Sequence, residues 1–252
     1  MNNELVILYV HHNKSPVTLH HYNLLKKYNT DKVIIPTGFE GGDLLDGSHV
    51  VKFNENYPKN DLLNTMLSGT MPISAQSDLI IYDFYLHHQD FNSYFVVEWD
   101  TYCNCSVDEC YGEAFEKYDT FSGRIFTNKL DVSDADEKRY VKEWSWYRMY
   151  YTATRTREQE EKIGPYLGAT YPTSLLYYKR KTLYDIVSLL LSNPRLYDNL
   201  QNEMRLGTLL QQSGYELNEY KRHTNQFCEQ PHYRDEIKRG IKGYYHAIKD
   251  IL

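Results

Sequence analysis

The stretch that decides the fold is Leu5-Val-Ile-Leu-Tyr-Val10, an unbroken apolar run of the length of a strand. A strand covered by helices on both faces has this pattern. Ser15-Pro16 then supplies a helix N-cap and a first-turn proline, and apolar residues at helical spacing predict a helix over 16–28. The run Lys32-Val-Ile-Ile-Pro36 is the next predicted strand. Strand, helix and strand in this order predict a right-handed parallel βαβ unit.

Further apolar segments extend this unit along the chain. Residues 50–53, 78–84 and 94–98 are predicted strands, and 202–212 is a predicted helix ended by Gly214. The whole pattern predicts an α/β fold with a Rossmann-like, mostly parallel central sheet flanked by helices, in a single domain over 1–252. Residues 1–105 are predicted to form its nucleotide-binding half, and 106–252 an extension of the same domain.

Composition excludes several classes of protein. The chain of 252 residues has 28 Lys and Arg against 34 Asp and Glu, a net charge of −6, whereas proteins that grip nucleic acid carry a basic surplus. No apolar run approaches the ~20 residues of a membrane span, and the N-terminus lacks the basic start of a signal peptide. Four cysteines suit a reducing compartment. We therefore expect a cytoplasmic protein without nucleic-acid partners.

The strongest site candidate is Tyr94-Phe-Val-Val-Glu98-Trp99-Asp100, in which a predicted buried strand runs into two carboxylates. Ligands of open α/β sheets bind at the carboxyl ends of the strands. Hard divalent cations such as Mg2+ and Mn2+ prefer carboxylate oxygens together with substrate phosphate. Glu98 and Asp100 are therefore predicted metal ligands.

This strand with its acidic triplet resembles the D-x-D motif of GT-A glycosyltransferases, with Glu98 as the first acid and Asp100 as the last. In that family the motif holds a divalent metal on the diphosphate of a nucleotide sugar. The resemblance implies a GT-A-like fold, a nucleotide-sugar donor and Mn2+ or Mg2+ as cofactor. It places Trp99, inside the triplet, beside the nucleotide. Asp83, at the end of the predicted strand 78–84, is expected to reach the same crevice and the nucleotide because of its position at a strand end.

Three other stretches are similar to the same family. The turn after the first strand contacts the nucleobase, which implies a role for His11 and His12. The stretch Asn202-Glu203-Met-Arg-Leu-Gly207 resembles the helix start where inverting members carry an acid, which implies Glu203 as the base. The stretch Gly243-Tyr-Tyr-His246-Ala-Ile-Lys249 resembles a terminal His-Pro-x-Lys element, with Ala247 in place of the proline. There the histidine completes the metal shell and the lysine contacts phosphate.

The acceptor side has an aromatic cluster and a loop. Trp144 and Tyr147 suit stacking on sugar rings, although such a stripe is more often core. Residues 168–174 are a predicted loop of small residues. In the family that the chain resembles, the corresponding loop lines the pocket for the sugar and the acceptor, so the resemblance implies this role for Thr170 and Thr173.

The predicted function is metal-dependent, inverting transfer of a hexose or pentose from a nucleotide sugar, with UDP-sugar the commonest donor in the family, to a glycan or other hydroxyl acceptor. A metal-dependent hydrolase or nucleotidyltransferase, and a carbohydrate-binding protein without catalysis, remain alternatives. Cys103, Cys105, Cys110 and Cys228 allow a zinc alternative of unusual spacing. Adjacent residues point in different directions, so the doublets His20-His21 and His87-His88 are not expected to ligate one ion pairwise.

Overall fold

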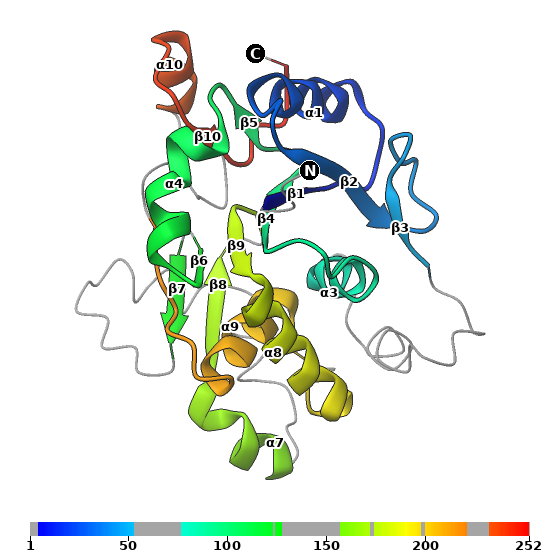
Figure 1. Cartoon of the computed structure of the whole chain (residues 1–252), viewed down its shortest axis with the longest axis vertical. Coiled ribbons are helices and arrows are strands. Elements are labelled where there is room, and N and C mark those ends of the chain that lie inside the picture. Colours follow the sequence, from blue (N-terminus) through cyan, green and yellow to red (C-terminus); the bar gives the residue numbers. More distant parts are fainter. Residues whose placement is uncertain are drawn as a thin grey trace.

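The computed structural model describes residues 5–52, 77–122, 124–127, 157–171, 174–197, 200–220 and 232–251 (Figure 1). The described strands are β1 (Leu5–Val10), β2 (Val33–Phe39), β3 (His49–Val51), β4 (Ser93–Glu98), β5 (Tyr102–Cys103), β6 (Thr120–Phe121), β7 (Arg124–Thr127), β8 (Gly168–Tyr171), β9 (Leu176–Lys179) and β10 (Tyr244–Tyr245). The described α-helices are α1 (Pro16–Tyr28), α3 (Asp78–His87), α4 (Val107–Lys117), α7 (Arg157–Lys162), α8 (Arg180–Ser192), α9 (Asn202–Gln212) and α10 (Tyr233–Lys238). Short 3-10 helices cover Gly164–Tyr166 and Pro194–Leu196.

The central sheet has six strands in the order β3-β2-β1-β4-β9-β6. The strands β3, β2, β1 and β4 are parallel, whereas β9 pairs antiparallel with both β4 and β6. This arrangement confirms the predicted fold class, an α/β fold with a mostly parallel central sheet flanked by helices. Strands on both sides of residue 105 share the sheet. The assignment of nucleotide binding to residues 1–105 stays a prediction.

Apolar side chains cover both faces of β1, as the unbroken run predicts. Val6, Leu8 and Val10 pack with α3, α8 and α9, whereas Ile7 and Tyr9 face α1 and α4. Ser15 accepts a hydrogen bond from the Thr18 amide and so begins α1 at the predicted residue. Figure 1 shows the sheet with α3, α8 and α9 below it and α1 above it. The two cores hold the strands, so the carboxyl ends of β1 and β4 lie fixed side by side.

The predicted strand at 78–84 is wrong, because Asp78–His87 is the helix α3. Every residue from Asp78 to Tyr85 is buried, so the helix is covered on all sides and its sequence shows no amphipathic stripe. A short helix of this kind has the same continuous apolar pattern as a buried strand. The correction moves Asp83 from the expected strand end into the middle of a helix.

The loop predicted at 168–174 is wrong for its first part, since Gly168–Tyr171 is the strand β8 and pairs antiparallel with β7. A second small ribbon joins distant parts of the chain, because β10 pairs antiparallel with β5. Tyr244 lies opposite Cys103 and Tyr245 opposite Tyr102. This ribbon brings the stretch 243–249 next to the acidic triplet that follows β4.

Gly38 allows close contact between β2 and the end of β1. A Cβ atom at this position would lie 2.5 Å from the His11 carbonyl oxygen and 2.6 Å from a Leu44 methyl carbon. We expect Gly38→Ala to lower the free energy of unfolding by about 2 kcal/mol, because backbone has to move. Urea denaturation measures this loss. Gly112→Ala is the matched control, since a Cβ in the middle of α4 meets nothing within 4 Å, and we expect it to be neutral or slightly stabilising.

None of the helices in the described part of the chain has the length and apolar character that crossing a bilayer requires.

Candidate functional site

The acidic triplet lies at the carboxyl end of β4, as predicted. Glu98, the last residue of the strand, is in register with Val10 of β1. The Glu98 amide donates to the Ser174 hydroxyl at 3.0 Å, and that hydroxyl also contacts the Thr101 hydroxyl at 3.0 Å. Ser174 is fully buried. These bonds fix the backbone from which both carboxylates project.

The C-terminal stretch completes the site from the other end of the chain. The Asn104 side chain holds it through two hydrogen bonds of 2.8 Å each. Its Nδ2 donates to the Ile241 carbonyl, and its Oδ1 accepts from the Gly243 amide. The Ile248 amide donates to the Asp100 carbonyl at 2.8 Å. His246 is thereby buried between the acids, with its Nε2 3.0 Å from Glu98 Oε2 and 3.3 Å from Asp100 Oδ1.

The departure from the family pattern at Ala247 has a backbone explanation. Ala247 has φ +68°, in the left-handed region. Proline fixes φ near about −65°, so it does not fit this turn. His246 therefore reaches the triplet through a turn that differs from a His-Pro turn.

The charges in this cluster stabilise one another. Burial opposes protonation of His246, but the hydrogen bonds and negative charges of Asp100 and Glu98 outweigh it and raise the pKa of His246 to about 10. Burial opposes the charged form of Asp100 as well, yet the hydrogen bond from His246 and the charges of His246 and Lys249 lower its pKa. Without a metal the cluster is an imidazolium held between carboxylates.

Glu98, Asp100 and His246 each offer a ligand atom, and these atoms lie within 4.8 Å of one another. Two carboxylate oxygens and one imidazole nitrogen form a donor set that suits Mn2+ or Mg2+. The residues present therefore fit the divalent ion that the resemblance implies. A single cation could replace the proton of His246 between the same atoms.

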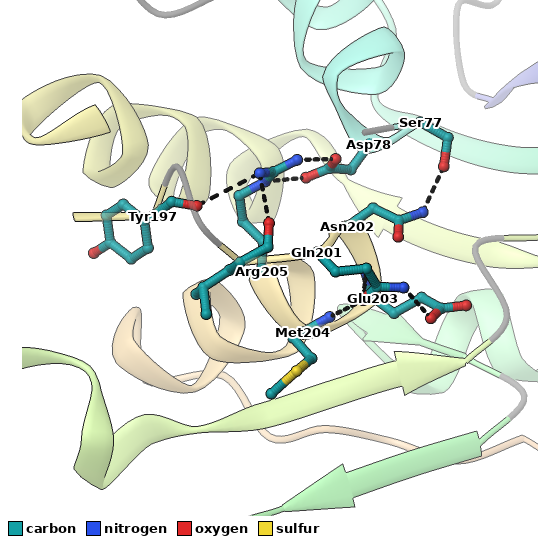
Figure 2. Close-up of polar contacts among 9 residues, drawn as sticks. Ser77, Asp78, Tyr197, Gln201, Asn202, Glu203, Met204 and Arg205 are labelled. Atoms are coloured by element: carbon teal, nitrogen blue, oxygen red, sulfur yellow. Dashed lines mark hydrogen bonds and ion pairs between the residues drawn. The ribbon is translucent and has the colours of Figure 1, made fainter. Parts of the chain in front are cut away.

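Glu203 lies in the first turn of α9, where Gln201 caps the helix. The Gln201 side-chain oxygen accepts from the amides of Glu203 and Met204 at 3.0 and 3.2 Å, and its side-chain amide donates to the Glu203 carboxylate (Figure 2). Burial raises the pKa of Glu203 to about 8, with a smaller contribution from the negative charge of Glu98, whereas Gln201 and His246 oppose the rise. Glu203 is thus a buried carboxyl close enough to Glu98 and His246 to interact with their charges.

A buried ion pair anchors α9 behind Glu203. The Arg205 guanidinium contacts both carboxylate oxygens of Asp78 in α3, at 2.7 and 2.5 Å, and neither side chain is exposed to solvent (Figure 2). Arg205 also donates to the Leu200 carbonyl at 2.9 Å. Next to it the Asn202 amide donates to the Ser77 hydroxyl at 2.6 Å. These bonds fix the first turn of α9 relative to the start of α3.

Three predicted nucleotide-binding residues lie at the same edge of the sheet. The exposed His12 meets the ring of Trp99 edge-on, with centroids 5.1 Å apart, and the Trp99 amide donates to the Val10 carbonyl. Lys249 is exposed, and its charge acts on Asp100. His11 is buried instead and contacts the Ser48 hydroxyl at 3.1 Å, and burial lowers its pKa.

The remaining predicted residues are not part of this cluster. Asp83 contacts His49 and is not in the group of Glu98, Asp100 and His246. Thr170 is buried in β8, and its hydroxyl has no hydrogen-bond partner among the described residues. Trp144, Tyr147 and Thr173 lie outside the described residues. Among the described cysteines, Cys105 and Cys110 are in contact, but neither metal-ligating cluster in the described ranges contains cysteine, and Cys228 lies outside these ranges.

Gln201 and Ser174 contact the site residues Glu203 and Glu98, although neither is predicted from the sequence. Gln201 stands one residue before a predicted helix, at the position where a side chain caps the first amides, so its place was open to prediction. Ser174 has no such signal, because its contact with Glu98 spans 76 positions of the chain. The same holds for His49, which the sequence pattern leaves unconnected to Asp83.

No protein-family model matches the chain, and no curated protein sequence matches it either. Among solved structures it is similar to the galactosyltransferase LgtC, which was crystallised in complex with donor and acceptor sugar analogues. The TM-score is 0.43 at 10% sequence identity, over 81% of this chain and 70% of that chain. This is a distant likeness, and the function proposed below rests on the geometry of the site.

Proposed function

We propose that the protein is a metal-dependent glycosyltransferase that uses a nucleotide-sugar donor, UDP-sugar being the first candidate. The observation that carries this proposal is the cluster of Glu98, Asp100 and His246 at the carboxyl end of β4, with the buried carboxyl of Glu203 close by. The edge of an α/β sheet where the strands end is where such folds bind nucleotides. A carboxyl near a metal cluster supplies the proton acceptor that transfer to a hydroxyl requires.

Glu98, Asp100 and His246 would hold the cation. When bound, Mn2+ or Mg2+ would neutralise the negative charge that develops on the leaving diphosphate. Lys249 would add a second positive charge, and the effect of its charge on the pKa of Asp100 supports this role. The aromatic rings of His12 and Trp99, which meet edge-on beside the end of β1, would contact the nucleobase.

Glu203 would act as the general base. The acceptor hydroxyl loses its proton to the Glu203 carboxylate while its oxygen bonds to the anomeric carbon, and the diphosphate leaves with the bonding electrons. A pKa near 8 is suited to this role, because a base works best when its pKa is close to the operating pH. Attack opposite to the leaving group would invert the anomeric configuration, and NMR of the product measures that configuration.

The first test is ligand binding, followed as thermal stability in the presence of nucleoside diphosphates with and without Mn2+. We expect UDP to raise the melting temperature only when Mn2+ is present, because a ligand that binds the folded state stabilises it. Asp100→Asn should abolish this shift. The exposed Asp90 provides the matched control, and Asp90→Asn should leave the shift unchanged.

Two outcomes would contradict the proposal. One is a nucleotide shift that does not depend on the metal and persists in Asp100→Asn. The other is the absence of a shift with every nucleoside diphosphate, which would favour a carbohydrate-binding protein. Release of free sugar or pyrophosphate in place of a glycoside would indicate a hydrolase or a nucleotidyltransferase.

A further inference from the structure

A second group of metal-ligating side chains lies on the edge strand β3 and the helix α3. It consists of His49, Asp83 and His87, whose ligand atoms lie within 4.8 Å of one another. His49 Nε2 is 2.8 Å from Asp83 Oδ2, and His87 Nδ1 is 3.6 Å from the same oxygen. Asp83 and His87 are four residues apart on one helix face, so α3 presents them together.

This second cluster is separate from the first. His49 pairs with Thr37, Thr37 with Val10, and Val10 with Glu98, so His49 and Glu98 lie in one row across four strands. Three strand spacings amount to about 14 Å, which is too far for one ion to bridge. The two clusters therefore need two ions.

The donor set of the second cluster differs from that of the first. Two imidazoles and one carboxylate suit Zn2+, which prefers nitrogen ligands and takes tetrahedral geometry with ligands about 3.4 Å apart. The solvent-exposed fraction of the side chain rises from 6% for Asp83 to 14% for His49 and 43% for His87. The exposed side leaves space for a fourth ligand such as water.

Neighbouring groups contact the ligand residues. His87 Nδ1 also contacts the Asp83 carbonyl at 2.8 Å, a hydrogen bond that the ring would exchange for the metal when Nδ1 binds it. The ring of Phe84 meets His49 edge-on at a centroid distance of 5.2 Å. The hydrogen bond between His49 and Asp83 thus joins two different elements of the fold, β3 and α3.

We propose that His49, Asp83 and His87 form a Zn2+ site that ties the edge strand β3 to α3. The strand β3 has three residues and lies at the edge of the sheet, where β2 is its one partner among the described strands. A cation bound to both elements closes the chain between them and adds its binding free energy to the folded state. This inference does not depend on the proposed function, because it uses none of the residues of the first cluster.

The test uses the full chain with Asp100→Asn, which disables the first cluster and leaves the second unchanged. Zn2+ is titrated in competition with a chromophoric chelator, and the melting temperature is followed with and without Zn2+. We expect one tightly bound Zn2+ per chain and a rise in melting temperature. Adding Asp83→Asn or His87→Ala should weaken Zn2+ binding by more than about 100-fold, because each removes one of three ligands.

His232→Ala in the same background is the matched control, since His232 is an exposed histidine remote from α3 in the chain, and Zn2+ affinity should not change. The exposure of His87 makes His87→Ala safe for folding, and circular dichroism without metal confirms this. Substitution by Co2+ should give visible absorption bands that His87→Ala removes. Failure of the Asp100→Asn protein to bind Zn2+, or equal affinity with and without His87, would overturn the proposal.

Discussion

Glu203→Gln is expected to reduce the rate of sugar transfer by about 1,000-fold, because it removes the proposed base. The glutamine keeps the size of the side chain and an oxygen that can accept from the Gln201 amide, so the cap of α9 is retained. UDP should therefore bind with Mn2+ as it does to the unsubstituted protein. Initial rates at saturating donor measure the loss, and a rate within a few-fold of the original would exclude Glu203 as the base.

The same substitution separates activity from stability. Folding raises the pKa of Glu203 from 4.5 to about 8, so the folded protein binds the proton more tightly than the unfolded chain. Stability is then fully present below pH 4.5 and is lost progressively as the pH rises to about 8. Glu203→Gln has no proton to lose, and it should be more stable than the original at pH 8 by a few kcal/mol, on the order given by this shift.

Two comparisons make the stability result specific. The advantage of Glu203→Gln should shrink as the pH falls from 8 to 5, as urea denaturation at each pH would measure. Glu160→Gln, at an exposed position of α7, should change neither activity nor stability at any of these pH values. An equal gain at pH 5 and pH 8 would contradict the raised pKa as the cause.

Arg205→Met is expected to lower the free energy of unfolding by about 3–5 kcal/mol. The substitution leaves the Asp78 carboxylate buried without its partner, and the Leu200 carbonyl loses a donor. Domains of this kind are stable by only about 5–15 kcal/mol, so the loss is a large fraction of the total. Urea denaturation followed by tyrosine fluorescence measures the change.

A double variant distinguishes an unpaired charge from lost packing. Asp78→Leu together with Arg205→Met removes both charges, and we expect it to be more stable than either single variant. The exposed pair of Lys162 and Glu158 is the surface comparison, and Lys162→Met should cost less than about 0.5 kcal/mol. A double variant as unstable as the sum of the singles would show that the ion pair is not the reason.

The parts of the fold that the sequence predicts are those set by local pattern. The strands β1 and β4 are unbroken apolar runs, and α1 begins at a serine cap followed by proline. The helix α3 is predicted as a strand because a helix buried on all sides has no amphipathic stripe in its sequence. The strand β8 is predicted as a loop because its pairing with β7 joins segments that are far apart in the chain.

The residues of the candidate site also differ in whether a local sequence pattern predicts them. Glu98 and Asp100 are predictable because a strand leads directly into them, and their metal-ligating arrangement with His246 agrees with the short match at 243–249. The interaction of Glu203 with Glu98 becomes visible only when the sheet and α9 are placed in space. The i, i+4 spacing of Asp83 and His87 is a local signal in the sequence. The third residue of that cluster, His49, is in β3, and no local pattern indicates that β3 and α3 lie together.

The antiparallel strand β9 has a consequence for the growing chain during synthesis. Phe95 of β4 pairs with Tyr177 of β9, so one edge of β4 has no partner until residues 176–179 have left the ribosome. An apolar strand edge left open is a template for pairing with other chains. The sheet is therefore completed on this side only after residues 176–179 have been made, which leaves the apolar strand β4 exposed to pairing with other chains for that time.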